Sequence, residues 1–175
     1  MERTVNLYFQ GMEFGQPQVH EHMVLFPIRS NLNPGPDYIT LSEALERGWL
    51  EVSEVSASGS VPELKATNKG LKPILMIDGE ELKGAKENRV LNTTIMIAPG
   101  TTIVIPVSCV EARRWHGSTL HMESSNNVMA HVIRRKKMEQ VNSNLETERS
   151  FRANQSEIWN GIELMAWKLN VQSPT

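Results

Sequence analysis

The chain has 175 residues, of which 39% are hydrophobic and 22% charged, so it can bury a core, and we expect a folded rather than a disordered chain. Its formal net charge of −2 provides no global field for nucleic acid or an anionic membrane, and its single cysteine, Cys109, rules out an internal disulfide framework. The sequence has no signal-peptide pattern and no apolar run of bilayer length, so we expect a cytoplasmic protein with neither nucleic acid nor membrane as a partner.

The first element expected is an amphipathic helix near the N-terminus. Residues 6–11 look like a protease-recognition remnant of recombinant expression, but Val5 stands where such a remnant carries glutamate, and no histidine tag precedes it. The alternative is a native helix, which we favour. Its apolar face would consist of Val5, Leu7, Tyr8, Phe9 and Met12.

A strand and then a well-marked helix follow. Residues 24–28 have strand composition, and the turn-forming residues 31–36 end that strand. Thr40 and Glu43 have the spacing of a capping box, and Gly48 is placed to follow the last helical turn. The inner face of this helix is expected to comprise Leu41, Ala44 and Leu45.

Residues 49–109 have the pattern of a sheet. Residues 50–55 alternate between apolar and polar, residues 63–67 form another candidate strand, and residues 73–77 are continuously apolar, as in a central strand. Hairpin turns are expected at Asp78-Gly79 and at residues 98–100, the latter between strands at 90–97 and 101–107. Because no long helix separates these strands, we expect consecutive strands to pair antiparallel.

Two helices are expected at the C-terminal end. For residues 127–145 the expected inner positions are Val128, Val132, Met138, Val141 and Leu145, and the basic run 134–137 is expected to form a solvated face. The last helix starts at the cap Asn154, reinforced by Glu157, and its inner face is expected to comprise Ile158, Ile162, Met165 and Leu169, widened by Trp159 and Ala166.

These elements predict an α+β fold. Its sheet is mainly antiparallel, a sandwich or a partly open barrel, with a short N-terminal helix, one early helix and two C-terminal helices. We expect a mainly β domain over residues 1–121, and a helical extension over residues 122–175 that packs on it and continues into a further C-terminal region.

The densest polar stretch, residues 78–89, directly follows the apolar strand. In a functional interpretation Asp78, Glu80 or Glu81 binds a metal or acts as a general base, and cationic and amide side chains hold an anionic group. The alternative is a solvated hairpin whose charges neutralise one another.

A second block covers residues 106–115. Strand alternation places Cys109 on the same face as Val107, so we expect a small buried residue rather than a nucleophile. Glu111 lies close in sequence to Arg114, and the sequence leaves open whether this carboxylate has a shifted pKa or simply forms an ion pair.

Together the two blocks resemble a known family. Residues 76–82, 84–86 and 88–89, followed by residues 106–111 and 114–115, are similar to the ARG-and-rhodanese-phosphatase-superfamily-associated protein domain, a largely uncharacterised prokaryotic family. The resemblance covers nearly the whole chain, including the opening helix, which favours the native helix. Two residues depart from the family pattern, Glu87 for an expected glutamine and Arg113 for an expected glycine. Members usually continue well past the equivalent of Thr175, so the resemblance also implies a downstream region.

The resemblance implies binding or processing of an ADP-ribose-like or other phosphorylated nucleotide-derived metabolite. Its name also suggests ADP-ribosylglycohydrolase- or phosphatase-type proteins as partners. Whether the chain is an enzyme stays open. The candidates are Glu81 and Glu111 for catalysis, Asp78 and Glu80 for a divalent cation, and, for ligand binding, Lys86, Asn88, Arg89, Asn92, Arg114 and Trp115.

The alternative function is a non-catalytic interaction or structural module. Such a module would dock a partner enzyme or the chain's own C-terminal half. It predicts an exposed apolar patch on the last helix that includes Trp159, Met165 and Trp167.

Overall fold

The computed structural model describes residues 2–30, 37–112 and 121–171. Contacts divide the chain into two compact units, Met1–Asp37 and Tyr38–Thr175. The boundary expected after residue 121 stays a prediction. Within the described residues, no helix combines the length and the apolarity that a membrane crossing requires.

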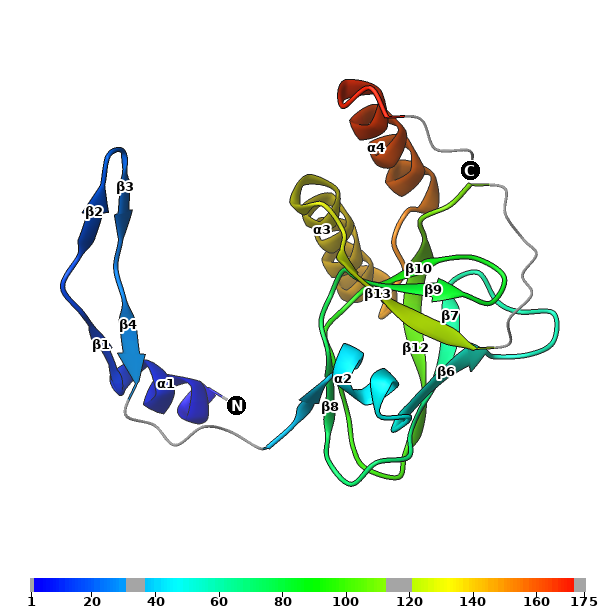
Figure 1. The fold of residues 1–175 in the computed structure, drawn as a ribbon, viewed down its shortest axis with the longest axis horizontal. Coiled ribbons are helices and arrows are strands. Elements are labelled where there is room, and N and C mark those ends of the chain that lie inside the picture. The colour runs from blue at the N-terminus through cyan, green and yellow to red at the C-terminus, as the bar shows by residue number, and fades with distance from the viewer. Residues whose placement is uncertain (1, 31–36, 113–120, 172–175) are drawn as a thin grey trace. The chain divides into compact units, whose positions relative to one another are not determined.

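The first unit consists of a helix and a long two-stranded ribbon (Figure 1). Helix α1 (Glu2–Gln10) confirms the expected N-terminal helix. In the ribbon, β1 (Met12–Phe14) pairs with β4 (Ile28–Ser30), and β2 (Gln18–His20) pairs with β3 (Met23–Leu25). The single strand expected at 24–28 is therefore wrong. Pro27 has no N–H to donate to a ladder, and it separates β3 from β4.

The second unit opens with β5 (Ile39–Thr40) and α2 (Leu41–Glu46), and the expected capping box is confirmed. Thr40 N donates to Glu43 Oε2 at 2.9 Å, and Glu43 N donates to Thr40 Oγ1 at 3.4 Å. Gly48 has a φ of +67°, as expected for the residue that ends this helix. Leu41 and Ala44 are fully buried, and they anchor α2 on the core.

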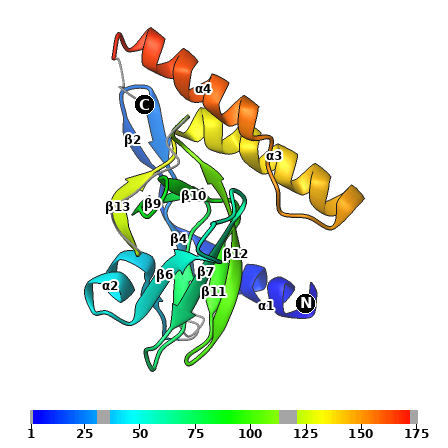
Figure 2. The same ribbon diagram turned by 90° about the vertical axis from the view of Figure 1, so that its right-hand side faces the viewer.

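The main sheet is a six-stranded half-barrel (Figures 1 and 2). Its strand order is β13-β9-β10-β12-β7-β6, and every pair is antiparallel. The strands are β6 (Leu50–Glu54), β7 (Glu63–Asn68), β9 (Glu80–Gly84), β10 (Arg89–Leu91), β12 (Thr102–Cys109) and β13 (Met122–Val128). Alternate side chains point inward and form the core, which includes Val52, Leu64, Leu82, Leu91, Ile105 and Val107. This arrangement confirms the expected α+β fold with a mainly antiparallel sheet.

A second sheet of three strands has β8 (Ile74–Met76) at its centre, between β11 (Ile95–Ile97) and β5. The central position of β8 confirms the prediction from its apolar run, but both expected hairpins are wrong. The strands on either side of Asp78-Gly79 lie in different sheets, as do those on either side of residues 98–100. The segment expected as one strand at 90–97 is interrupted at Asn92, so β10 pairs with β12 while β11 pairs with β8.

Helices α3 (His131–Glu148) and α4 (Gln155–Lys168) lie side by side against one part of the half-barrel (Figure 2). The expected start of α3 at residue 127 is wrong, because residues 122–128 form β13. The buried positions of α3 are Ile133, Lys137 and Val141, whereas the expected inner residues Val132, Met138 and Leu145 are exposed. The Asn154 cap of α4 is confirmed, since its side chain accepts from the backbone N–H of Ser156 and Glu157.

A glycine holds the turn between β8 and β9. Gly79 has a φ of +82°, and a Cβ at this position would lie 2.9 Å from Cδ of Arg134. We expect Gly79→Ala to lower the free energy of unfolding by about 2 kcal/mol, because it combines backbone strain with displacement of Arg134. Gly100→Ala is the control, since Gly100 has a similar φ of +67° but a Cβ at its position would have no atom within 4 Å. Urea unfolding of both variants measures the difference, and equal losses would contradict the steric part of this prediction.

Candidate functional site

Arg89 lies inside one end of the half-barrel. It is the first residue of β10, and it stands opposite Leu82 on β9 and Cys109 on β12. Residues in register share a face of the sheet, so Arg89 points inward with Leu82. Its side chain is fully buried. A buried guanidinium requires compensating charge, and two carboxylates provide it.

The two carboxylates belong to Glu87 and Glu54. Arg89 Nη1 donates to Glu87 Oε2 at 2.9 Å, and Arg89 Nη2 lies 3.9 Å from Glu54 Oε1. Glu54 is the last residue of β6, where Leu50 and Val52 also point inward. Both carboxylate oxygens of Glu54 are buried, and neither accepts a hydrogen bond from any of the described residues.

Cys109 belongs to the same interior cluster. Burial, together with a hydrogen bond to the Glu87 carboxylate, raises the pKa of the thiol to about 12. The side chain is 1% exposed, which confirms the expected buried position. At neutral pH this cysteine is a protonated thiol, and a protonated thiol is a poor nucleophile.

Loops close this end of the barrel. Lys86 Nζ donates to the Ser58 carbonyl at 2.9 Å, and the Asn88 backbone N–H donates to Glu111 Oε2 at 2.9 Å. Four of the candidate residues therefore meet here. We define the barrel-end cluster as the interior residues and the loop residues around them: Glu54, Lys86, Glu87, Asn88, Arg89, Cys109 and Glu111.

Asp78 is engaged elsewhere, by helix α3. Its Oδ2 accepts from Arg134 Nε at 2.9 Å, and its Oδ1 accepts from Lys137 Nζ. Lys137 also donates to the Leu91 carbonyl at 2.9 Å. Burial lowers the pKa of the Lys137 ammonium, against the opposing effect of Asp78. The solvated face expected for residues 134–137 is thus wrong for Lys137, which is 1% exposed.

Glu80, the second metal candidate, accepts the Ile77 backbone N–H at 2.7 Å, and burial raises the pKa of its carboxyl group. Across the described ranges, no three His, Cys, Asp or Glu side chains are grouped closely enough to hold a metal ion. The divalent-cation role of Asp78 and Glu80 stays a prediction.

The remaining candidates occupy other places. Glu81 stands opposite Val90, so it faces the other side of the sheet from Arg89, and its Oε2 accepts from Ser125 Oγ at 2.7 Å. Asn92 accepts from Ser108 Oγ at 2.7 Å and donates to the Phe151 carbonyl at 3.0 Å, which ties the sheet to the connection between α3 and α4. Arg114 and Trp115 lie outside the described residues. The assigned roles of these residues stay predictions.

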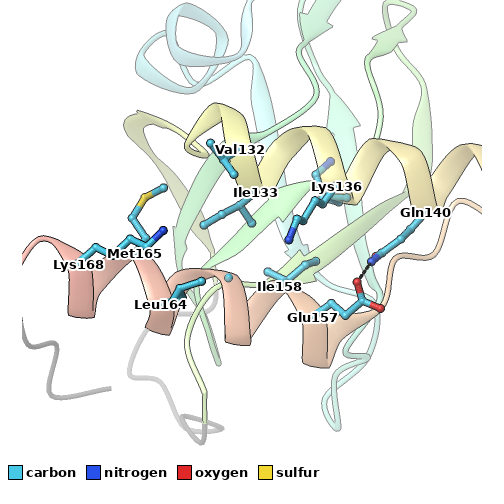
Figure 3. A pocket seen from close by; sticks show the side chains of 11 residues that line it. Val132, Ile133, Lys136, Gln140, Glu157, Ile158, Leu164, Met165 and Lys168 are labelled. Carbon is cyan, nitrogen blue, oxygen red and sulfur yellow. Dashed lines mark hydrogen bonds between the residues drawn. The ribbon is translucent and has the colours of Figure 1, made fainter.

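Two cavities lie outside the barrel-end cluster. One, of about 500 Å³, lies between α2, β6 and the start of β13. Its lining includes the acidic residues Glu46 and Glu51 and the basic residue Lys69, and acidic groups outnumber basic ones. The other, of about 140 Å³, is a mainly apolar groove between α3 and α4 (Figure 3). Ile133 and Ile158 face one another across this groove, and Gln140 reaches Glu157 at one of its ends. Neither cavity is lined by a residue of the barrel-end cluster.

Sequence reasoning missed two polar residues that matter, Glu54 and Lys137. For Glu54 a signal existed, since the alternation that turns Leu50 and Val52 inward also turns Glu54 inward. For Lys137 the signal was its spacing from Ile133 and Val141, four residues in each direction on one helical face.

Comparison with known proteins supports one family. The family model described as ARG and Rhodanese-Phosphatase-superfamily-associated Protein domain matches residues 11–175. No curated protein and no solved structure gives a significant match. The match spans the first-unit ribbon, the half-barrel and both C-terminal helices. The chain therefore belongs to the ARG and Rhodanese-Phosphatase-superfamily-associated Protein domain family.

Proposed function

We propose that this chain binds a phosphorylated nucleotide-derived metabolite, such as ADP-ribose, at the barrel-end cluster. The observation that carries the proposal is the gathering of Lys86, Asn88, Arg89 and Glu111 at one end of the half-barrel. Ligand sites are common in the mouths of β-barrels, where loops supply polar groups above a rigid sheet. The family name adds a contextual link to phosphatase-superfamily proteins.

The residues at this end of the barrel differ in exposure, and we assign their roles in binding accordingly. Lys86 and Asn88 are half-buried in the loop, where a cation and an amide suit phosphate oxygens. Arg89 is fully buried, with its positive charge paired to Glu87 and Glu54. Glu111, also half-buried, is our candidate for the general base if the bound metabolite is also processed.

We expect ADP-ribose, supplied at about 100 to 1,000 times its dissociation constant, to stabilise the chain by about 3–4 kcal/mol. Thermal shift and calorimetric titration, with and without magnesium, measure this effect. Lys86→Met should weaken binding about tenfold, because it removes a charge-assisted contact worth roughly 1.4 kcal/mol. Lys83→Met is the matched control, since Lys83 is an exposed lysine on β9 that lies near Glu123. Equal affinities of the two variants would contradict the role of Lys86.

A second candidate function is an interaction module, and the surface of α4 favours it. Trp167 is 77% exposed, and its apolar neighbours Leu164 and Leu169 are also exposed. Trp159 and Met165, expected in the same patch, are half-buried. The partner would be an ADP-ribosylglycohydrolase- or phosphatase-type protein, or the chain's own C-terminal half. A folded chain that responds to no ligand in the titration favours this function over the first.

A further inference from the structure

The carboxylate of Glu54 lacks hydrogen-bond donors among the described residues. Both oxygens are buried, and within the described residues neither accepts a hydrogen bond. A buried carboxylate without donors is costly, and native structures nearly always provide a partner for such a group. A group that donates hydrogen bonds to these oxygens would therefore stabilise the position.

Arg89 does not fill this role. Its Nη2 atom is 3.9 Å from Glu54 Oε1, which is beyond hydrogen-bond distance, whereas its Nη1 atom makes a 2.9 Å bond to Glu87. A polar pair separated by more than 3.5 Å commonly has another polar atom between its members. The positive charge of Arg89 thus stabilises the ionised form of Glu54 without a hydrogen bond, so both oxygens of Glu54 can still accept one.

The surroundings of Glu54 select the class of donor. The nearby guanidinium repels a metal cation, and the described part of the chain holds no group of three potential metal ligands. A neutral hydroxyl avoids this repulsion. Two adjacent hydroxyls match two carboxylate oxygens, as when an acidic side chain binds ribose in nucleotide sites.

We propose that Glu54 binds the vicinal hydroxyls of the ligand's ribose inside the barrel end; this assignment rests on the proposed function above. The phosphate stays near the loop, beside Lys86. In the structure Lys86 Nζ holds the β6–β7 loop through the Ser58 carbonyl, and residues 56–58 of that loop are exposed. A phosphate that competes for Lys86 weakens this contact and gives the ribose access to Glu54.

Calorimetric titration of the full chain with ADP-ribose, D-ribose and inorganic phosphate tests the assignment. Glu54→Gln should weaken ADP-ribose binding at least tenfold and leave phosphate binding unchanged. Glu51→Gln is the matched control, because Glu51 lies on the same strand but points outward and pairs with Lys69. Glu54→Asp, which keeps the charge beside Arg89 but withdraws the oxygens by one methylene, carries the test if the amide variant does not fold.

A 2′-deoxyribose analogue of the ligand closes a double-mutant cycle. It should bind the wild type at least tenfold more weakly than ADP-ribose does, and show no further loss with Glu54→Gln. Independent losses from the analogue and from the variant would overturn the role of Glu54 while leaving the proposed function intact. Binding of D-ribose through Glu54 without binding of any phosphorylated ligand would support Glu54 and overturn the proposed function. No binding of ADP-ribose or D-ribose would overturn both.

Discussion

Replacing Lys137 by methionine is expected to lower the free energy of unfolding by about 3 kcal/mol. The side chain is 1% exposed, and its ammonium donates to Asp78 and to the Leu91 carbonyl. Removing one member of a buried ion pair leaves the other as an uncompensated buried charge, which typically costs about 3–5 kcal/mol. We expect the lower end of this range, because Arg134 still pairs with Asp78.

Lys136→Met is the matched control for this prediction. Lys136 is the neighbouring lysine on α3, but it is exposed, so its loss should change stability by less than about 0.5 kcal/mol. The double variant Asp78→Asn with Lys137→Met removes both charges and should recover part of the loss. Equilibrium urea unfolding measures all three variants. Similar losses for Lys136→Met and Lys137→Met would show that the buried pair does not anchor α3.

Asn68→Ala is expected to cost about 3 kcal/mol, the second large effect. This fully buried amide donates to the carbonyls of Lys72 and Ile97 at 2.9 and 3.1 Å, and accepts from the Gly70 N–H at 2.9 Å. Alanine leaves three backbone groups without this partner, two buried and one part-buried, at about 1 kcal/mol for each lost hydrogen bond. The end of β7 would lose this hydrogen bond to β11.

Thr67→Ala provides the comparison for Asn68. Thr67 is the preceding residue of β7 and points to the other face, where its hydroxyl meets that of Thr102 at 3.0 Å. Because this contact is exposed to solvent, we expect a loss of less than about 1 kcal/mol. Thermal unfolding followed by circular dichroism distinguishes the two. A larger loss for Thr67 would contradict the role of the buried amide.

Local signals in the sequence predicted the elements of the second unit better than their pairing. The capping box at Thr40 and the cap at Asn154 depend on neighbouring residues alone, so the sequence displays them completely. The pairing of β8 with β11 and of β10 with β12 depends on where the chain leaves one sheet for the other. That crossing occurs around Asp78 and Asn92, and both residues look like ordinary turn residues in the sequence.

The candidate site was also predictable only in part, because its local residue pattern is visible in the sequence and its long-range contacts are not. The cluster of Lys86, Asn88 and Arg89 could be read from the sequence, but the burial of Arg89 could not, because it depends on register with Leu82 and Cys109. Asp78 looked like a ligand because the partner that engages it, Lys137, lies 59 residues later in the sequence. Long-range ion pairs of this kind leave no local pattern.

The Gln155 side chain completes the backbone hydrogen bonding at the end of β12. Its amide donates to the Cys109 carbonyl at 2.7 Å and accepts from the Cys109 N–H at 2.8 Å, on the side of β12 where pairing with β7 has already ended. This side-chain amide, at the start of α4, thus makes the two hydrogen bonds that a neighbouring strand would otherwise make with Cys109. Gln155 therefore satisfies the backbone N–H and carbonyl of Cys109, which would otherwise stay without a partner on the side that β7 no longer covers.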